Sequence, residues 1–274
     1  MCRWLAYSGP EIYLETLLLK PANSLIRQSL SSQRGTVPTN GDGFGLGWYA
    51  GKPEPGLFRD TRPAWNDDNL RSISEQIASP LFFAHVRASS GTATMRPNCH
   101  PFRHDRWLFM HNGHIADFES IRRELENLIE PELFLHRRGT TDSEAFFYLL
   151  LSNGFAGDPE GALVTTTRLV HDVMAAAAID GPLRLTAVAT EGSKIIAVRY
   201  ASDGEPPSLF HARCLDVLPE FGIEEEALMD ETAFLIVSEP LDDVTEHWVE
   251  VPASSLLVAS GDKIVVTPFE PRAH

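Results

Sequence analysis

The chain has 274 residues, of which 43% are hydrophobic and 22% are charged, as is typical of a folded globular protein. Its net charge of −15 argues against the basic surfaces with which proteins bind nucleic acids or anionic membranes. The three cysteines are Cys2, Cys99 and Cys214, and we find no apolar run long enough for a signal peptide or a membrane span. We therefore expect a cytoplasmic protein with reduced thiols.

Hydrophobic periodicity and turn residues predict the elements in chain order. Strands are predicted at residues 2–8, 44–50, 56–61, 81–88, 106–111, 183–190, 195–200, 208–212, 232–238, 247–251, 255–259 and 263–268. Helices are predicted at residues 11–20, 67–79, 117–129, 141–152 and 159–179, with a capping box at 141–144. Strands, then a helical middle, then strands again indicate one α+β layered domain over residues 2–274.

Two strands carry more specific information. In the strand at 81–88, alternation places residues 82, 84 and 86 on one face and residues 83, 85 and 87 on the other. Arg87 is charged and lies on an otherwise apolar strand, so it needs a partner. The continuous apolar run at 234–237 indicates a strand that is buried on both faces.

Cys2 is the first candidate for chemistry. If Met1 is removed, Cys2 combines a nucleophilic thiol with a free α-amine, whose ordinary pKa of about 7.7–8.0 suits a general base. One residue would then supply both the nucleophile and the base. Its position alone fits equally well an incidental apolar cysteine that opens a strand.

Two pairs of residues could act on an amino-acid amide. Asn112 and Gly113 offer a side-chain and a backbone N–H for an oxyanion, although Asn-Gly is also a common tight-turn signal and we expect a turn here. Arg87 and Asp142 could bind the carboxylate and the ammonium of an amino acid. The alternatives are a structural ion pair for Arg87 and a favourable helix-dipole position for Asp142.

The sequence indicates no cofactor. The glycine-rich segment at 40–47 matches neither the dinucleotide nor the phosphate-loop motif, so we interpret it as a loop that passes close to another segment, such as the nucleophile. Histidines at 85, 100, 104, 111 and 114 lie on strands and turns without a complete ligand signature, so we expect no metal. A metal-dependent hydrolase stays an alternative that metal analysis would test.

Taken together, these segments resemble the class II glutamine amidotransferase family. The resemblance rests on Met-Cys-Arg at 1–3, Asn-Gly-Asp-Gly-Phe-Gly at 40–45, and residues 83–89, 98–102, 109–113 and 141–144, in this order. The resemblance implies the four-layer αββα sandwich of N-terminal-nucleophile hydrolases. It implies that Cys2 is the nucleophile, that its α-amine is the base, and that Asn112 and Gly113 form the oxyanion hole.

The resemblance also implies how a substrate is bound. Arg87 would hold the α-carboxylate of glutamine, Asp142 its α-ammonium, and His100 would shape the site. A γ-glutamyl thioester would form on Cys2 with release of ammonia, and water would then free glutamate.

Several alternatives stay open. The chain has no room for the ammonia-consuming domain of the large family members, and it is similar to the small stand-alone ones. The substrate could be glutamine or a γ-glutamyl amide of thiol metabolism, and the ammonia acceptor could be a separate synthetase subunit. Retention of Met1 would block the α-amine and would favour a non-catalytic glutamine-binding module.

Overall fold

The computed structural model describes residues 2–34, 38–89, 91–213, 218–223 and 232–271. The state of Met1 and the position of Cys214 therefore lie outside the described residues. Within those ranges, no helix combines the length and the apolar character that crossing a membrane requires.

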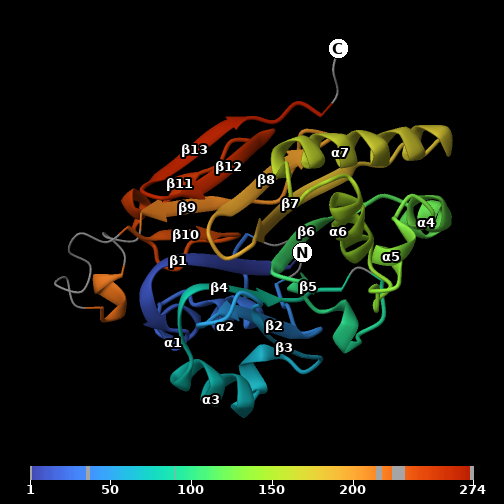
Figure 1. Ribbon diagram of the computed structural model, residues 1–274. Coiled ribbons are helices and arrows are strands. Elements are labelled where there is room, and N and C mark those ends of the chain that lie inside the picture. The colour runs from blue at the N-terminus through green and yellow to red at the C-terminus, as the bar shows by residue number, and fades with distance from the viewer. Residues whose placement is uncertain (1, 35–37, 90, 214–217, 224–231, 272–274) are drawn as a thin grey trace.

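The described strands form two antiparallel sheets, which lie at the centre of the molecule (Figure 1). The first sheet has the spatial order β11 (Val249–Glu250), β9 (Phe210–Arg213), β10 (Phe234–Val237), β1 (Arg3–Tyr13), β4 (Ala78–Val86), β2 (Phe44–Tyr49) and β3 (Gly56–Asp60). The second sheet has the order β13 (Lys263–Pro268), β12 (Ser255–Ser260), β8 (Ile195–Ala201), β7 (Leu183–Thr190), β6 (Trp107–Ile115) and β5 (Phe102–His104).

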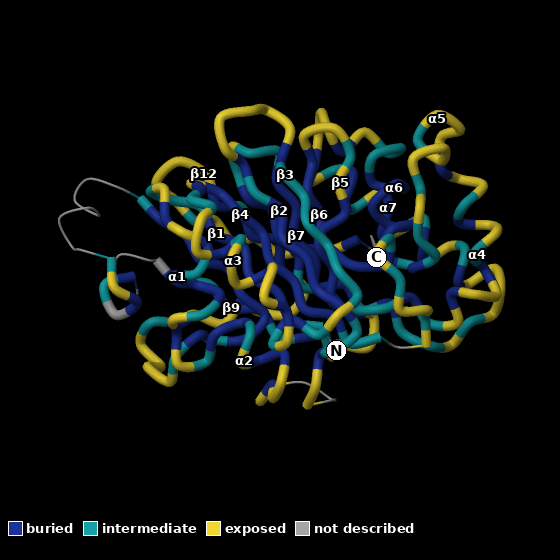
Figure 2. The backbone as a smooth tube through the Cα atoms, turned by 90° about the horizontal axis from the view of Figure 1, so that it is seen from below, coloured by how far each residue is buried: buried dark blue, intermediate teal, exposed yellow. Residues whose placement is uncertain are grey.

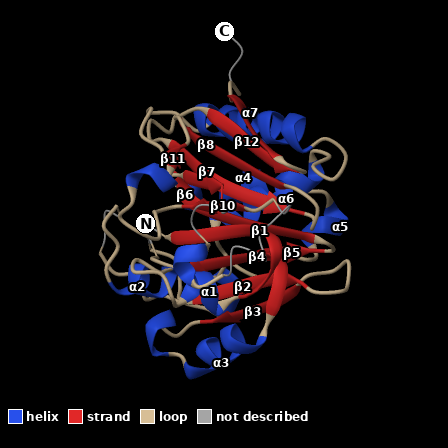
Figure 3. Cartoon of the chain, turned by 90° about the vertical axis from the view of Figure 1, so that its left-hand side faces the viewer, coloured by secondary structure: helices blue, strands red, loops and turns tan. Residues whose placement is uncertain are grey.

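Helices cover the outer face of each sheet. The first sheet packs against α1 (Glu15–Leu18), α2 (Leu25–Leu30) and α3 (Asp68–Gln76). The second packs against α4 (Phe118–Glu126), α6 (Asp142–Ser152) and α7 (Pro159–Ala176), and the short α5 (Pro131–Phe134) lies beside α6. Figure 3 shows α3 and α7 at opposite ends of the view with the strands between them. The arrangement is the four-layer αββα sandwich of the N-terminal-nucleophile type, as predicted.

The helix starts follow from side chains that bond to the first free backbone N–H groups. Asp67 accepts from the N–H of Leu70 at 2.7 Å, and Thr141 Oγ1 accepts from the N–H of Glu144 at 3.2 Å. Such caps contribute about 1 kcal/mol each. The predicted cap at Thr141 is therefore confirmed, and it fixes where Asp142 enters the helix.

A hydrophobic layer between the two sheets holds them together. Trp4 and Phe83 come from the first sheet, and Leu108, Met110 and Val188 come from the second. Each is at most 1% exposed, and burying a large apolar side chain contributes about 1.5–3 kcal/mol. Figure 2 shows the buried strands in dark blue, enclosed by exposed loops and helices. Because the candidate active-site strands β1, β4 and β6 all border this layer, their backbones are held rigidly.

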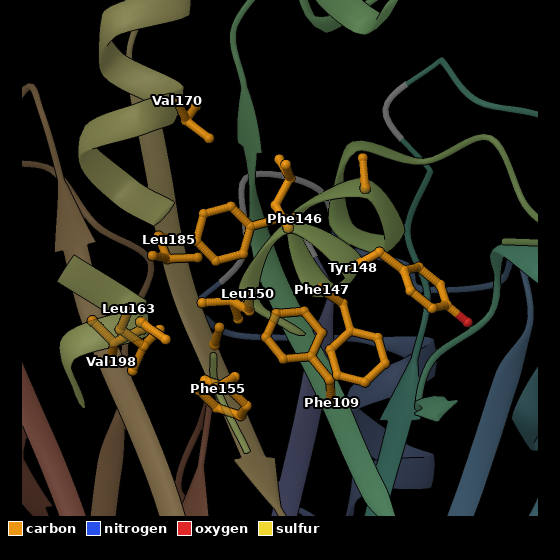
Figure 4. Packing of buried hydrophobic residues seen from close by; sticks show 14 of the residues in the cluster. Phe109, Phe146, Phe147, Tyr148, Leu150, Phe155, Leu163, Val170, Leu185 and Val198 are labelled. Atoms are coloured by element: carbon orange, nitrogen blue, oxygen red, sulfur yellow. The ribbon is translucent and has the colours of Figure 1, made fainter. Parts of the chain in front are cut away.

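The outer core of the second sheet is rich in aromatic residues (Figure 4). Phe109 of β6 stacks on Phe147 of α6, with ring centroids 5.1 Å apart. Phe146 of α6 lies beside the same strand. Aromatic pairs of this kind contribute about 0.5–1.5 kcal/mol beyond their buried area. This packing fixes the start of α6 relative to β6.

The alternation predicted for the strand at 81–88 is confirmed. Phe82, Ala84 and Val86 pack in the core beneath α1, α2 and α3, whereas Phe83 packs between the sheets. The run at 234–237 is likewise buried on both faces, since Leu235 faces the first of these cores and Ile236 the second.

Three sequence-based predictions are wrong. The helix predicted over residues 67–79 ends at Gln76, because β4 already begins at Ala78. The helix predicted over residues 11–20 begins only at Glu15, because β1 continues and pairs Ile12 with Ser79 of β4. The turn predicted at Asn112 and Gly113 is absent, since β6 runs on to Ile115 and pairs with β7. The backbone pairing with a distant strand overrides the local turn preference of Asn-Gly. The short elements α2, α5 and β5 were not predicted.

Candidate active site

Cys2 lies immediately before β1, the strand next to β4 in the first sheet. Its sulfur is 3.4 Å from the backbone nitrogen of Ala88 and 3.5 Å from the Ala88 carbonyl oxygen. Antiparallel pairing of β1 with β4 brings the two segments together, because Arg3 stands opposite Val86. Burial raises the pKa of the Cys2 thiol, whereas the Ala88 N–H and the charge of Arg87 lower it.

Arg87 follows the end of β4 and is only 3% exposed. Its guanidinium donates to the hydroxyl of Thr92 at 2.6 Å, to that of Ser89 at 3.2 Å and to the backbone oxygen of Asp42 at 3.3 Å. All these acceptors are neutral, and no carboxylate forms an ion pair with Arg87 within the described ranges. A buried guanidinium without a carboxylate is ready to bind one from a ligand.

Asn112 and Gly113 lie on β6, which faces β1 and β4 across the sandwich. The side-chain nitrogen of Asn112 is buried and has no hydrogen-bond partner among the described residues. An unpaired buried donor lowers the stability of the folded protein by about 1–3 kcal/mol, unless a ligand oxygen accepts its hydrogen bond. A β-carbon at Gly113 would lie 2.0 Å from the carbonyl oxygen of Arg184, so only glycine fits at this position.

Asp142 is the first residue of α6, and its carboxylate is tied to the neighbouring strand. One oxygen accepts from the N–H of Ile115 at 2.9 Å, and the other accepts from the N–H of Ser143 at 2.7 Å. In the part of the chain that the structure describes, no cationic side chain pairs with it. Its negative charge is therefore available to a ligand, and the N-terminus of α6 favours that charge.

His100 is buried and packs against two aromatic rings. Its ring stacks on that of His85, with ring centroids 4.3 Å apart, and its centroid lies 4.4 Å from that of the Phe102 ring. Burial lowers the pKa of His85 to about 3 and holds that of His100 well below its usual range. Both rings are therefore neutral at pH 7. Among the described residues, no group of three or more His, Cys, Asp or Glu side chains is placed to hold a metal.

All six residues predicted to form the site line one cavity of about 360 Å³: Cys2, Arg87, His100, Asn112, Gly113 and Asp142. This volume lies within the usual range for small-molecule sites. The cavity thus has a thiol, an unpaired amide donor, a cation and an anion. A larger cavity of about 420 Å³, beside Arg59 and Tyr148, is lined by none of the six.

Eight further residues line the cavity, and three of them were not predicted as site residues but bear directly on the site: Thr92, Ser143 and His111. Thr92 holds Arg87, and Ser143 bonds to His111. Ser143 and His111 lie inside the sequence segments that carry the family resemblance, which was the available signal for them. No local pattern marks Thr92.

The glycine-rich segment passes close to the residues around Arg87 and His100. The carboxylate of Asp42 accepts from the N–H of Ser89 at 2.7 Å. A β-carbon at Gly45 would lie 2.2 Å from the carbonyl oxygen of His100. The glycines therefore let β2 approach the segment that holds His100.

A buried ion pair holds the backbone of Cys2 in place. Arg3 is 0% exposed, Glu239 is 2% exposed, and Arg3 Nε donates to Glu239 Oε2 at 3.0 Å. Arg3 Nη1 also donates to the carbonyl oxygen of Cys2 at 2.8 Å. The C-terminal half of the chain thereby helps to fix the backbone of Cys2.

Comparisons with known proteins identify the family of the chain. The sequence model for class II glutamine amidotransferases matches residues 20–273. A probable glutamine amidotransferase of Saccharomyces cerevisiae is 33% identical over 301 residues, which cover 98% of this chain and 84% of the yeast protein. The γ-glutamyl-hercynylcysteine sulfoxide hydrolase of Mycolicibacterium smegmatis is 26% identical, over 98% of this chain and 100% of that protein.

A solved structure agrees as well. The class II glutamine aminotransferase domain protein of Silicibacter pomeroyi superposes with a TM-score of 0.73 at 31% identity, and the match covers 98% of this chain and 99% of that one. The fold, the cavity and these matches together show that the chain belongs to the class II glutamine amidotransferase family of enzymes.

Proposed function

We propose that this protein hydrolyses the side-chain amide of glutamine, or a related γ-glutamyl amide, through a γ-glutamyl thioester on Cys2. The proposal depends above all on one observation. The Cys2 sulfur shares a single cavity with an unpaired amide donor, a guanidinium and a carboxylate. These groups match the reacting amide, the α-carboxylate and the α-ammonium of one amino acid.

The reaction begins once Met1 has been removed, in this proposal. The α-amine of Cys2 takes the thiol proton, and the sulfur attacks the amide carbon of the substrate. The Asn112 side chain and the Gly113 N–H stabilise the oxyanion, and ammonia leaves with a proton from the amine. Water then attacks the thioester, which frees glutamate and restores the thiol.

Substrate binding is assigned to the two charged groups that line the cavity. Arg87 holds the α-carboxylate and Asp142 the α-ammonium, while His100 forms the wall beside them. Support comes from Arg87 and Asp142 each lacking an ionic partner within the described ranges. The reduced state of Cys2 that this chemistry requires fits a cytoplasmic location, which is part of the proposal.

The test uses protein whose intact mass shows that Met1 is absent. We expect ammonia release from glutamine, and covalent labelling of Cys2 by a glutamine analogue that carries an electrophile at the δ position. The Cys2→Ala variant, which keeps the anchors, should bind glutamine without releasing ammonia. Wild-type protein that lacks Met1 and shows neither turnover nor labelling would exclude glutamine as the substrate.

A γ-glutamyl amide of thiol metabolism is the second candidate substrate. The observation in its favour is the match to the sulfoxide hydrolase over nearly the whole of both chains. A comparison of kcat/KM for glutamine and for a γ-glutamyl amide with a larger leaving group distinguishes the two. An ammonia-accepting synthetase subunit stays a prediction, which co-purification from the source cells would test.

A further inference from the structure

The imidazole of His111 has a tautomer that its partners determine. Its Nε2 lies 3.1 Å from the carbonyl oxygen of Arg184, which can only accept, so Nε2 carries a hydrogen. Its Nδ1 lies 2.8 Å from the hydroxyl oxygen of Ser143. Burial lowers the pKa of His111, so the ring is neutral at pH 7 and Nδ1 is an acceptor. The Ser143 hydroxyl therefore donates to His111.

The same hydroxyl has a second possible acceptor. Ser143 Oγ lies 3.2 Å from Asp142 Oδ1, farther than it lies from the imidazole. A serine hydroxyl has a single hydrogen, and donating it to His111 withholds it from Asp142. In this state the Asp142 carboxylate accepts hydrogen bonds only from the backbone N–H groups of Ile115 and Ser143, within the described part of the chain.

We propose that His111 is a positioning residue for substrate recognition, and that it acts through the hydrogen bond it accepts from Ser143. Neutral His111 draws the Ser143 hydroxyl hydrogen away from Asp142, so that the carboxylate keeps its acceptor capacity for the substrate ammonium. The inference rests on the proposed function, because it takes Asp142 as the ammonium anchor. It explains why a histidine lies on β6 next to Asn112 and lines the cavity without a described hydrogen bond to the Cys2 sulfur.

The proposal predicts what happens when the imidazole acceptor is lost. The hydroxyl of Ser143 would turn to Asp142 Oδ1, its next acceptor. A donor already on the carboxylate competes with the substrate ammonium, and a hydrogen bond to a charged group contributes about 1.5–3 kcal/mol. The substrate ammonium loses only part of this energy, because the carboxylate keeps other lone pairs that can accept from it. Discrimination in favour of substrates with an α-ammonium should therefore fall about tenfold.

The experiment compares glutamine with 4-carbamoylbutanoate, which is glutamine without its α-amino group. Both amides use the same nucleophile and the same oxyanion donors, so their ratio of kcat/KM isolates recognition of the ammonium. We expect His111→Phe to lower this ratio about tenfold, mainly through the KM of glutamine. Adding Ser143→Ala to His111→Phe should restore the ratio, because the misdirected hydroxyl is then gone. Ser143→Ala alone, the matched control, should leave the ratio within about twofold of the wild type.

A ratio that His111→Phe leaves unchanged, or that the double variant fails to restore, would overturn the inference. A second measurement does not depend on the variant folding. The ¹⁵N chemical shifts of His111 in the wild-type protein should show a neutral ring protonated at Nε2. A ring protonated at Nδ1 would also overturn the inference. Failure of the proposed function is distinguishable, since the wild type would then hydrolyse neither amide.

Discussion

The buried pair of Arg3 and Glu239 yields an asymmetric prediction for stability. The carboxylate of Glu239 accepts from Arg3 and also from Asn23 Nδ2 and from the backbone nitrogens of Gln33 and Arg34, at 3.0–3.2 Å. The guanidinium of Arg3 has one other acceptor, the Cys2 carbonyl, and its Nη2 has no partner within the described ranges. Arg3 therefore depends on Glu239 more than Glu239 depends on Arg3.

The magnitudes follow from this difference. Glu239→Ala leaves a fully buried cation unpaired and should lower the free energy of unfolding by about 3–5 kcal/mol. Arg3→Met leaves a carboxylate that keeps three N–H donors, so the loss should be about 1–3 kcal/mol. Urea unfolding followed by tryptophan fluorescence and circular dichroism measures both losses. The exposed pair of Lys20 and Glu15 is the control, and Lys20→Ala should cost under about 1 kcal/mol. Equal losses for the two buried variants, or a greater loss for Arg3→Met, would refute the reasoning.

Three further predictions concern the site. Asn112→Ala should lower kcat about 10²–10³-fold with little change in KM, because its amide serves the transition state; steady-state ammonia release measures this, and an unchanged kcat would contradict it. Gly45→Ala places a β-carbon 2.2 Å from the His100 carbonyl oxygen and should cost about 1–3 kcal/mol in urea unfolding, whereas Gly157→Ala, whose nearest neighbour is 3.8 Å away, should be nearly neutral. The folded-state pKa of His85, about 3, lies below its unfolded value of about 6.5, so the unfolded chain binds the proton first and stability falls as the pH drops below 6.5. Between pH 7 and pH 5 the titration of His85 should lower the free energy of unfolding by about 2 kcal/mol. His85→Phe should therefore make the free energy of unfolding depend less on pH. An equal slope in the wild type and the variant would count against a lowered pKa of His85.

The parts of the structure that could be predicted from the sequence are those that local patterns determine. Alternation placed the side chains of β4 on their correct faces, and the cap at Thr141 located the start of α6. The six candidate site residues were found because they lie in short segments that resemble a known family. Each of these signals spans only a few consecutive residues.

The parts that could not be predicted depend on partners distant in the chain. Asn112 continues a strand because it pairs with Thr186 of β7, and no nearby residue indicates that pairing. Arg3 and Glu239 are 236 positions apart, and neither lies in a motif that points to the other. Such contacts are set by the sheet order, which the local pattern of hydrophobic residues leaves undetermined.

The location of the cavity follows from the sheet order as well. The first sheet contributes Cys2 and Arg87, because β1 and β4 are antiparallel neighbours and the start of one meets the end of the other. The second sheet contributes Asn112 through β6, and α6 adds Asp142. The nucleophile and one anchor thus belong to one sheet, while the oxyanion donor and the other anchor belong to the opposite layer.

The two halves of the site can therefore keep their spacing only if the layer between the sheets stays tightly packed. Leu108 and Met110 of β6 lie in that layer, a few residues from Asn112, and they face Trp4 and Phe83 of the first sheet. A cavity made there would let the sheets shift, and catalysis depends on sub-ångström placement of the oxyanion donor. Met110→Ala should therefore lower the free energy of unfolding by about 2–5 kcal/mol. It should also lower kcat, although Met110 does not line the site cavity. Ammonia release and urea unfolding of the same preparation test this, and a destabilised but fully active variant would show that the sheets hold their spacing without that packing.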